Sequence, residues 1–358
     1  MAATVVAVET ATVTLPLPQP LRLGAMDVLA REYAGIRITT AEGFTGTAYC
    51  LTRDAPVEQI ITQLFSPRLQ GADSSDPASL WDQLFRGTAI VGRVGLVRKA
   101  LGLVDIALWD IAAQRAEKPL WQLLDAGDAP RETVLVACYP DASRRLEDLV
   151  EEITGYSRAG WPLLKISRSP DRDLMRDLLE RVERAMAPGS ELIIDAGFGW
   201  PDSSAALADL SAWGQPRLAW LEDPLLPEDI TGCAEVSAGI HSPLGVGDEV
   251  TDPVVLENLM DHGGVDVLRL DVVAIGGITP SRGVIAAARR RQVPVSGHIY
   301  PEVTVHLGIG VETFDRRGNR YDPSAQLIAG GPTFEPGLAF PPTAPGLGFT
   351  LREFGFGA

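Results

Sequence analysis

Three carboxylates, Asp195, Glu222 and Asp248, each stand at the end of an apolar run that predicts a buried strand. Neighbouring carboxylates are separated by about one strand-plus-helix unit, roughly 30 residues. Parallel strands that alternate with helices end on one rim of a barrel, so we expect these side chains to converge. Carboxylate oxygens suit a hard divalent cation. The pattern therefore predicts a metal site, with Glu249, next to Asp248, as the competing third ligand.

Five further residues with reactive or charged side chains lie at the ends of other strand-like runs. These are Lys165, Ser167, Asp271, His298 and Glu312. A lysine inside the buried pattern PLLKIS needs a role or a partner, because lysine is rarely buried alone. We therefore expect Lys165 to face the same cavity as the three carboxylates.

This set of residues suits the removal of a proton next to a carboxylate. The enediolate that forms needs positive charge, which a divalent metal and Lys165 would supply. His298 is the predicted base, because the pKa of histidine lies near neutrality, and Asp271 would hold its ring. Glu312 would hydrogen-bond to the substrate carboxylate if its surroundings keep it protonated.

Each of these residues also has a structural explanation when it is taken alone. A single carboxylate at a strand end is more often a cap or one half of an ion pair. Three on consecutive strands favour a metal site, and a histidine that follows the Asp271 strand favours catalysis. Ser167 is either a silent residue or a catalytic group, and the glycines of AIGGIT and LIAGGP are weak evidence for phosphate loops. Structural or surface positions are predicted for the other histidines, which are His241, His262 and His306.

The sequence pattern changes near residue 131. Before it, an alternating run at 4–15 and two strands around a turn at 41–43 predict a three-stranded meander, followed by helices. After it, eight strand-like runs alternate with helical stretches. This predicts an α/β fold built on a modified (β/α)8 TIM barrel, of the (β/α)7β type because the last crossover is too short for a full helix.

Three segments follow from these patterns. Residues 1–130 are predicted to form an α+β capping domain, and residues 131–325 the barrel with the catalytic site. Residues 326–358 are rich in glycine and proline, but their Phe and Leu content predicts a packed segment that returns to the capping domain. The proline-rich stretch at 16–26 is predicted to be a loop without regular structure.

The composition limits the possible function. Of the 358 residues, 46% are hydrophobic and 22% charged, which is typical of a globular protein. The net charge of -16 argues against a general affinity for nucleic acid or anionic membrane. Three widely spaced cysteines match neither a disulfide framework nor a zinc site. With no basic leader and no apolar run of about 18 residues, we expect a cytoplasmic protein.

Several motifs resemble the enolase superfamily, and within it the mandelate racemase subgroup, over nearly the whole chain. DVVAIGGIT, VSGHIYPE and GVETFD are similar to the motifs that carry the dyad aspartate, the dyad histidine and the carboxylate-binding glutamate. The resemblance implies these roles for Asp271, His298 and Glu312. It also implies that the three strand-end carboxylates are magnesium ligands, with one Mg²⁺ per subunit.

The resemblance implies abstraction of an α-proton from a carboxylate substrate. The family pattern Lys-x-Lys is broken here, because Lys165 is followed by Ser167, and a serine without an activating neighbour is a poor base. This favours dehydration of an acid sugar to a 2-keto-3-deoxy acid by His298 alone. A racemase or epimerase is the alternative, and a catalytically impaired carboxylate-binding homologue is the third hypothesis. Gly197, where related enzymes often carry Asn, suggests altered substrate contacts.

The resemblance also bears on partners. It implies a small-molecule carboxylate substrate and a homo-oligomer, between a dimer and an octamer. If the capping domain docks as in the family, residues 16–26 and 44–47 would cover the barrel mouth and determine specificity.

Overall fold

A computed structural model of the chain describes residues 3–23, 26–316 and 320–356. It begins with an antiparallel sheet in the order β1-β2-β3. The strands are β1 (Val5–Leu23), β2 (Met26–Thr40) and β3 (Thr45–Leu51). The predicted three-stranded meander is confirmed, including the turn between β2 and β3.

The prediction of an irregular proline-rich loop at 16–26 was wrong for the residues described. β1 continues through this stretch to Leu23 and pairs with β2 as far as Leu23↔Met26, with a register shift between Pro16 and Leu21. β1 is the edge strand of its sheet, where a missing proline N–H disrupts no ladder on the open side. Residues 24 and 25 of the predicted loop lie outside the described residues.

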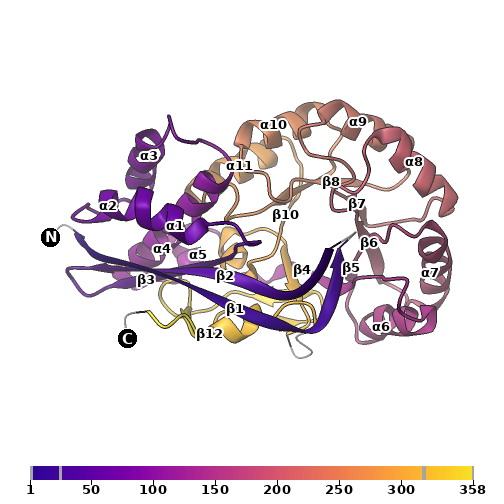
Figure 1. The fold of residues 1–358 in the computed structure, drawn as a ribbon, viewed down its shortest axis with the longest axis horizontal. Helices are drawn as coiled ribbons and strands as arrows, with labels where there is room; N and C mark the ends of the chain where they lie inside the picture. Colours follow the sequence, from indigo (N-terminus) through magenta and orange to yellow (C-terminus); the bar gives the residue numbers. More distant parts are fainter. Residues whose placement is uncertain (1–2, 24–25, 317–319, 357–358) are drawn as a thin grey trace.

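A helical layer follows the sheet. It consists of α1 (Val57–Ile60), a π-helical turn η1 (Ile61–Phe65), α2 (Ser66–Leu69), α3 (Pro77–Gly87), α4 (Leu96–Arg115) and α5 (Leu120–Leu123). Asp76 accepts hydrogen bonds from the backbone N–H groups of Ala78 and Ser79 and thereby begins α3. Figure 1 shows α4 between the N-terminal sheet and the barrel. No helix in the described part of the chain is both long and apolar enough for a membrane span.

Eight parallel strands form the barrel. They are β4 (Arg131–Cys138), β5 (Leu163–Ser167), β6 (Glu191–Asp195), β7 (Trp220–Glu222), β8 (Leu244–Val246), β9 (Val267–Leu270), β10 (Val295–Gly297) and β11 (Val311–Phe314). β4 to β10 are adjacent in sequence order. β11 pairs with β4, and a bridge between Ser296 and Gly310 connects it to the β10 side. The barrel predicted from the eight strand-like runs is confirmed.

Helices connect the first seven of these strands. They are α6 (Leu146–Arg158), α7 (Arg172–Ala185), α8 (Ser203–Ala212), α9 (Ile230–Gly239), α10 (Pro253–His262) and α11 (Ile278–Arg290). In α7, for example, Met175, Leu178 and Val182 are buried at helical spacing, which holds that helix against the barrel. Between β10 and β11 there are only α12 (Pro301–Thr304) and the 3₁₀ turn η2 (Val305–Leu307). This last crossover is short, as predicted.

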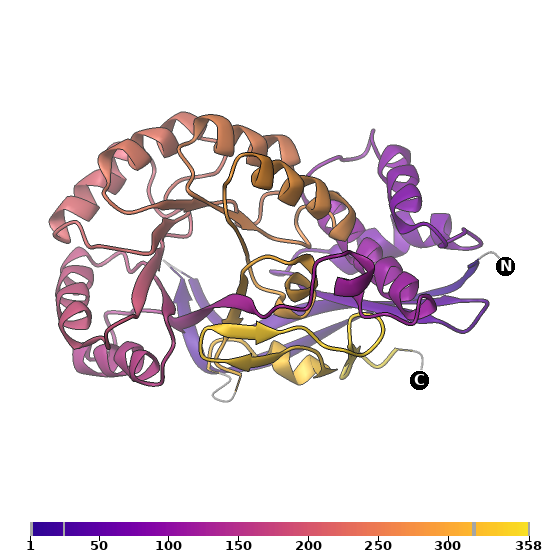
Figure 2. The same cartoon turned by 180° about the vertical axis from the view of Figure 1, so that it is seen from behind.

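The C-terminal segment contacts both the barrel and the N-terminal elements. It contains the 3₁₀ turn η3 (Ser324–Leu327), β12 (Ile328–Gly330), β13 (Thr333–Glu335), β14 (Leu338–Phe340) and β15 (Phe349–Leu351). β14 pairs with β4, which is visible from behind in Figure 2. Gly346 and Leu347 hydrogen-bond to Leu120 and to Asp110 of α4.

The helix α4 lies close to the backbone of the barrel at one glycine. A Cβ atom on Gly102 would come within 2.3 Å of the Val273 carbonyl oxygen, in the turn after β9. Gly277 of the same turn faces Asp105, whose carboxylate accepts hydrogen bonds from the N–H and the hydroxyl of Thr279. The glycines of AIGGIT therefore pack against α4, which accounts for them without a phosphate.

We expect Gly102→Ala to destabilise the protein by about 1–3 kcal/mol, because the added methyl group overpacks this contact. Gly283→Ala, in α11, is the matched control, since nothing lies within 4 Å of its Cβ position. That change should stabilise by about 0.5–1 kcal/mol through helix propensity. Urea unfolding of both variants measures the difference. Equal effects of the two changes would contradict the close contact.

Candidate functional site

The side chains predicted from strand ends lie on one rim of the barrel. Asp195 and Glu222 end β6 and β7 and are adjacent in register, and Ser167 pairs with Asp195 at the end of β5. Asp248, Asp271 and His298 follow β8, β9 and β10, and Glu312 lies within β11. Ligand oxygens of the three predicted metal residues lie within 4.8 Å of one another.

Lys165 connects three carboxylates at this rim. Its Nζ lies 2.6 Å from Glu222, 3.2 Å from Asp195 and 2.5 Å from Glu312, and its side chain is only 3% exposed. Burial lowers the pKa of this lysine, but the surrounding carboxylates outweigh burial and hold the pKa well above its usual range. Lys165 is therefore a buried ammonium facing the site, as predicted.

Arg269 is a second buried cation that the sequence analysis missed. Its side chain, on β9, has no exposed surface. The Nε atom lies 3.1 Å from Glu222 and 3.2 Å from Asp248, and a terminal nitrogen lies 2.5 Å from Glu312. The other terminal nitrogen donates to the Ser296 hydroxyl at 2.7 Å. A charged residue inside the buried run VDVLRLD, two positions before Asp271 and thus on the same strand face, was the signal available in the sequence.

Charge balance in this region fits a divalent cation. We use the name acidic cluster for four carboxylates, those of Asp195, Glu222, Asp248 and Glu312. The two buried cations that face them are Lys165 and Arg269, so the four ionised carboxylates and these two cations together carry a net charge of two negative when His298, which also contacts Asp248, is neutral. Burial raises the pKa of Glu222 to about 7, although the positive charges of Arg269 and Lys165 act to lower it. A dication would balance the cluster and favour the ionised form of Glu222.

Asp248 is positioned by a neighbouring buried aspartate. Asp223 accepts hydrogen bonds from the backbone N–H groups of Gly247 at 2.9 Å and Asp248 at 3.2 Å. The next residue, Glu249, has a left-handed backbone with φ of 58°. The two adjacent acidic side chains consequently belong to different groups: Asp248 to the acidic cluster and Glu249 to a group with Asp271 and His298.

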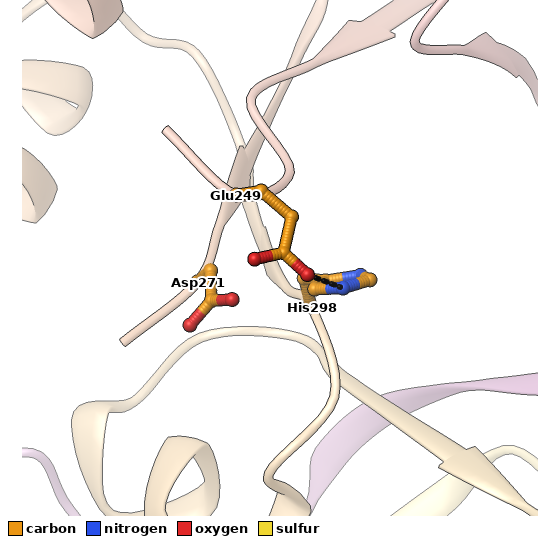
Figure 3. A group of neighbouring side chains, drawn as sticks. All are labelled: Glu249, Asp271 and His298. Atoms are coloured by element: carbon orange, nitrogen blue, oxygen red, sulfur yellow. Dashed lines mark ion pairs between the residues drawn. The ribbon is translucent and has the colours of Figure 1, made fainter. Parts of the chain in front are cut away.

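Figure 3 shows this second group, the His298 group, formed by Glu249, Asp271 and His298. Glu249 lies 3.8 Å from His298 Nε2. It also pairs with Arg53 at 2.6 Å and with the buried Lys99 of α4 at 3.3 Å. Two cations from the N-terminal part thus balance the two carboxylates of the His298 group even without a charge on His298, so the group has no excess negative charge that would bind a metal ion.

His298 contacts the acidic cluster through its other nitrogen, Nδ1, which lies 2.7 Å from Asp248 Oδ2. Burial lowers the pKa of His298, but Asp248 and Glu249 outweigh burial and hold the pKa well above its usual range. Asp271 accepts hydrogen bonds from the N–H groups of Val273 and Ala274 through Oδ1, and its buried Oδ2 has no hydrogen-bond partner among the described residues. The expected hydrogen bond between Asp271 and His298 is absent among the described residues, although the two side chains share one group.

The sequence analysis assigned Glu312 a role that requires its carboxyl group to be protonated, and the structure does not support that protonation. Burial raises its pKa, but Lys165 and Arg269 outweigh burial and lower the pKa below its usual value. It is therefore ionised in this arrangement and is not a protonated donor. Ser167 is partly buried, and within the described part of the chain its hydroxyl has no hydrogen-bond partner that would activate it.

Comparison with known proteins matches both halves of the chain to one family. A model of the mandelate racemase/muconate lactonizing enzyme N-terminal domain matches residues 5–125, and a model described as enolase C-terminal domain-like matches residues 148–354. The second match alone spans more than half of the chain.

Individual relatives are distant but similar over most of their length. L-talarate/galactarate dehydratase of Salmonella typhimurium is 27% identical, over 88% of this chain and 79% of its own. A 3,6-anhydro-alpha-L-galactonate cycloisomerase of Streptomyces coelicolor is also 27% identical, over 81% of each chain. The structure of L-talarate dehydratase from Polaromonas sp. JS666, complexed with Mg and L-glucarate, superposes with a TM-score of 0.86 at 25% identity and covers 98% of this chain and 95% of its own.

Proposed function

Because the chain belongs to the mandelate racemase/muconate lactonizing enzyme family of the enolase superfamily, we propose that it dehydrates an acid sugar. The reaction removes the proton α to the carboxylate and the hydroxyl group at the β-carbon, and gives a 2-keto-3-deoxy acid. The observation that carries this proposal is the acidic cluster with its net charge of two negative beside a buried lysine and a histidine.

Asp195, Glu222 and Asp248 would hold one Mg²⁺. Its oxygen-only ligand set and the charge balance support this assignment, and the similar L-talarate dehydratase structure is complexed with Mg. The ion would supply positive charge for the enediolate oxygens. Glu249 is disfavoured as a ligand, because its carboxylate is paired with Arg53 and Lys99.

Lys165 would bind the substrate carboxylate. Its ammonium is held at the rim by three carboxylates, and a fixed buried cation stabilises developing negative charge without reorganisation. Glu312 would act by holding Lys165 and Arg269 in place, since both cations lie 2.5 Å from its Oε2. This replaces the expectation of a protonated Glu312 donor.

His298 would take the α-proton and return it to the departing hydroxyl as water forms. A cation on Asp248 would compete for the oxygen that His298 contacts, and the unpartnered Oδ2 of Asp271 is then the available acceptor for the ring. The loss of water leaves an enol, and tautomerisation gives the keto acid. No described residue hydrogen-bonds to the Ser167 hydroxyl, which supports this one-base route over two-base racemisation.

A substrate panel in D₂O with Mg²⁺ tests the proposal. Aldonic and aldaric acids should yield 2-keto-3-deoxy acids, detected as their semicarbazones, and turnover should stop after chelation of the metal. Deuterium in recovered substrate with inversion, and without keto acid, would indicate the racemase or epimerase instead. No keto acid and no α-proton exchange across the panel would leave a carboxylate-binding homologue and refute the dehydratase. A cytoplasmic location and a homo-oligomer between dimer and octamer remain part of this proposal.

A further inference from the structure

The hairpin of β1 and β2 reaches over the carboxyl ends of two barrel strands. Leu17, Leu21 and Val28 of the hairpin pack with Tyr139, which follows β4, and with Phe314, which ends β11. Figure 1 shows the same hairpin extending from the N-terminal sheet to the barrel. Side chains on the barrel-facing side of the hairpin are therefore close to the rim that carries the site.

Arg31 is such a side chain. Alternate residues of a strand share one face, and Arg31 and Tyr33 of β2 line the same cavity. Across it are Ile299 and Thr313, which directly follow His298 and Glu312. The Arg31 guanidinium lies over the Phe314 ring, with its central carbon 5.7 Å from the ring centre. The cavity thus lies between the hairpin and the residues that directly follow His298 and Glu312 in the chain.

Arg31 has no acceptor among the described residues that line this cavity. Its Nε is buried without a hydrogen-bond partner, and it forms no ion pair with any described residue. The other charged groups here are matched: Arg316 pairs with Glu302, and Asp322 accepts from Tyr33 and Ser324. Arg31 as a whole is half-buried, but a buried N–H group without an acceptor is costly, so an anionic group beside Nε would be stabilised.

Tyr139 connects Arg31 with the acidic cluster. Tyr139 packs in one cluster with Phe314, whose ring lies beside the Arg31 guanidinium. Burial raises the pKa of the Tyr139 phenol, while the positive charges of Arg31 and Lys165 act to lower it. A chain that binds at Lys165 by one end would therefore approach Arg31 with its other end.

We propose that Arg31 binds a second anionic group at the far end of the substrate. The guanidinium is permanently charged and matches a carboxylate or phosphate with two parallel hydrogen bonds. The preferred substrate class is then an acid sugar with anions at both ends. This inference rests on the proposed function and narrows its substrate. Aldaric acids and terminally phosphorylated aldonic acids share the required chemistry.

The test compares kcat/KM for aldaric acids, for aldonic acids of the same configuration and for their terminal phosphates. Wild type should have a higher kcat/KM for one of the two doubly anionic classes than for the aldonic acids, whose far end is uncharged. Arg31→Gln should lower that preference ratio by about 10²-fold, the equivalent of one lost pair of charge-assisted hydrogen bonds. Arg37→Gln is the matched control, because Arg37 lies on the same strand but pairs with Glu9. An unchanged ratio in Arg31→Gln would overturn the inference.

A binding measurement separates this inference from the proposed reaction. If wild type turns over no acid sugar, thermal-shift assays with Mg²⁺ and galactarate or galactonate still report on Arg31. Stabilisation by galactarate that exceeds that by galactonate, and that Arg31→Gln removes, would sustain the subsite while the dehydratase fails. Turnover of acid sugars with no dependence of the ratio on Arg31 would sustain the dehydratase and refute the subsite.

Discussion

Replacing His298 by asparagine should lower kcat for acid-sugar dehydration by about 10²–10⁴-fold, the usual contribution of a general base. Asparagine keeps a polar side chain near Asp248, which His298 contacts at 2.7 Å, but it has no basic nitrogen. Mg²⁺ affinity, measured by calorimetry, should change much less than kcat. The loss should also appear in α-proton exchange in D₂O, because no other step precedes it.

His241→Asn is the control, since His241 is exposed and lies outside both groups at the rim. It should exchange and dehydrate like wild type. Retention of α-proton exchange in His298→Asn would assign the base to another residue, and Glu249, 3.8 Å from the ring, would be the next candidate.

Replacing Arg269 by methionine should destabilise the metal-free protein by about 3–5 kcal/mol, the typical cost of removing one partner from a buried ionic network. The change leaves Glu222, Asp248 and Glu312 without a cation that all three contact. Urea unfolding in the presence of a chelator measures this effect. Arg37→Met should cost about 0–1 kcal/mol, because its pair with Glu9 is about 30% exposed.

Mg²⁺ should restore more stability to Arg269→Met than it adds to wild type. Two effects compete. The loss of ligand positioning typically lowers the metal affinity 10–100-fold, which corresponds to about 1.4–2.8 kcal/mol of binding free energy. Removing a unit positive charge within about 5 Å of a dication favours binding by several kcal/mol at an effective dielectric constant of about 20. The electrostatic effect is larger, so the unfolding midpoint of the variant should rise more with Mg²⁺. Equal rises in both proteins would show that Arg269 does not contribute to the charge balance of the acidic cluster.

Much of the site was predictable from local sequence. An apolar run that ends in an acidic or basic residue predicts both a buried barrel strand and a side chain at its rim. This logic, with the family resemblance, brought together Lys165, Asp195, Glu222 and Glu312, and in the structure Lys165 contacts all three carboxylates. The sequence alone also showed that Ser167 departs from the family pattern Lys-x-Lys, because this departure concerns the identity of a single residue in a motif.

Tertiary structure decided which charges balance one another. Arg269 becomes a central cation only because Glu222, Asp248 and Glu312 come to it from three other strand ends. Local spacing carries no information on contacts between residues so far apart. The same holds for Lys99, which lies 150 positions from Glu249 and, together with Arg53, balances the carboxylates of the His298 group.

The three carboxylates that end or follow β6, β7 and β8 show most clearly what the sequence determined and what the tertiary structure decided. Their convergence on one rim follows from strand periodicity and the common direction of parallel strands, so the sequence determined it. The separation of Asp248 from Glu249 depends on the left-handed backbone at residue 249 and on cations supplied by the N-terminal part. Backbone conformation and long-range charge pairing exist only in the folded chain, and they decided which of the two adjacent carboxylates lies in the acidic cluster.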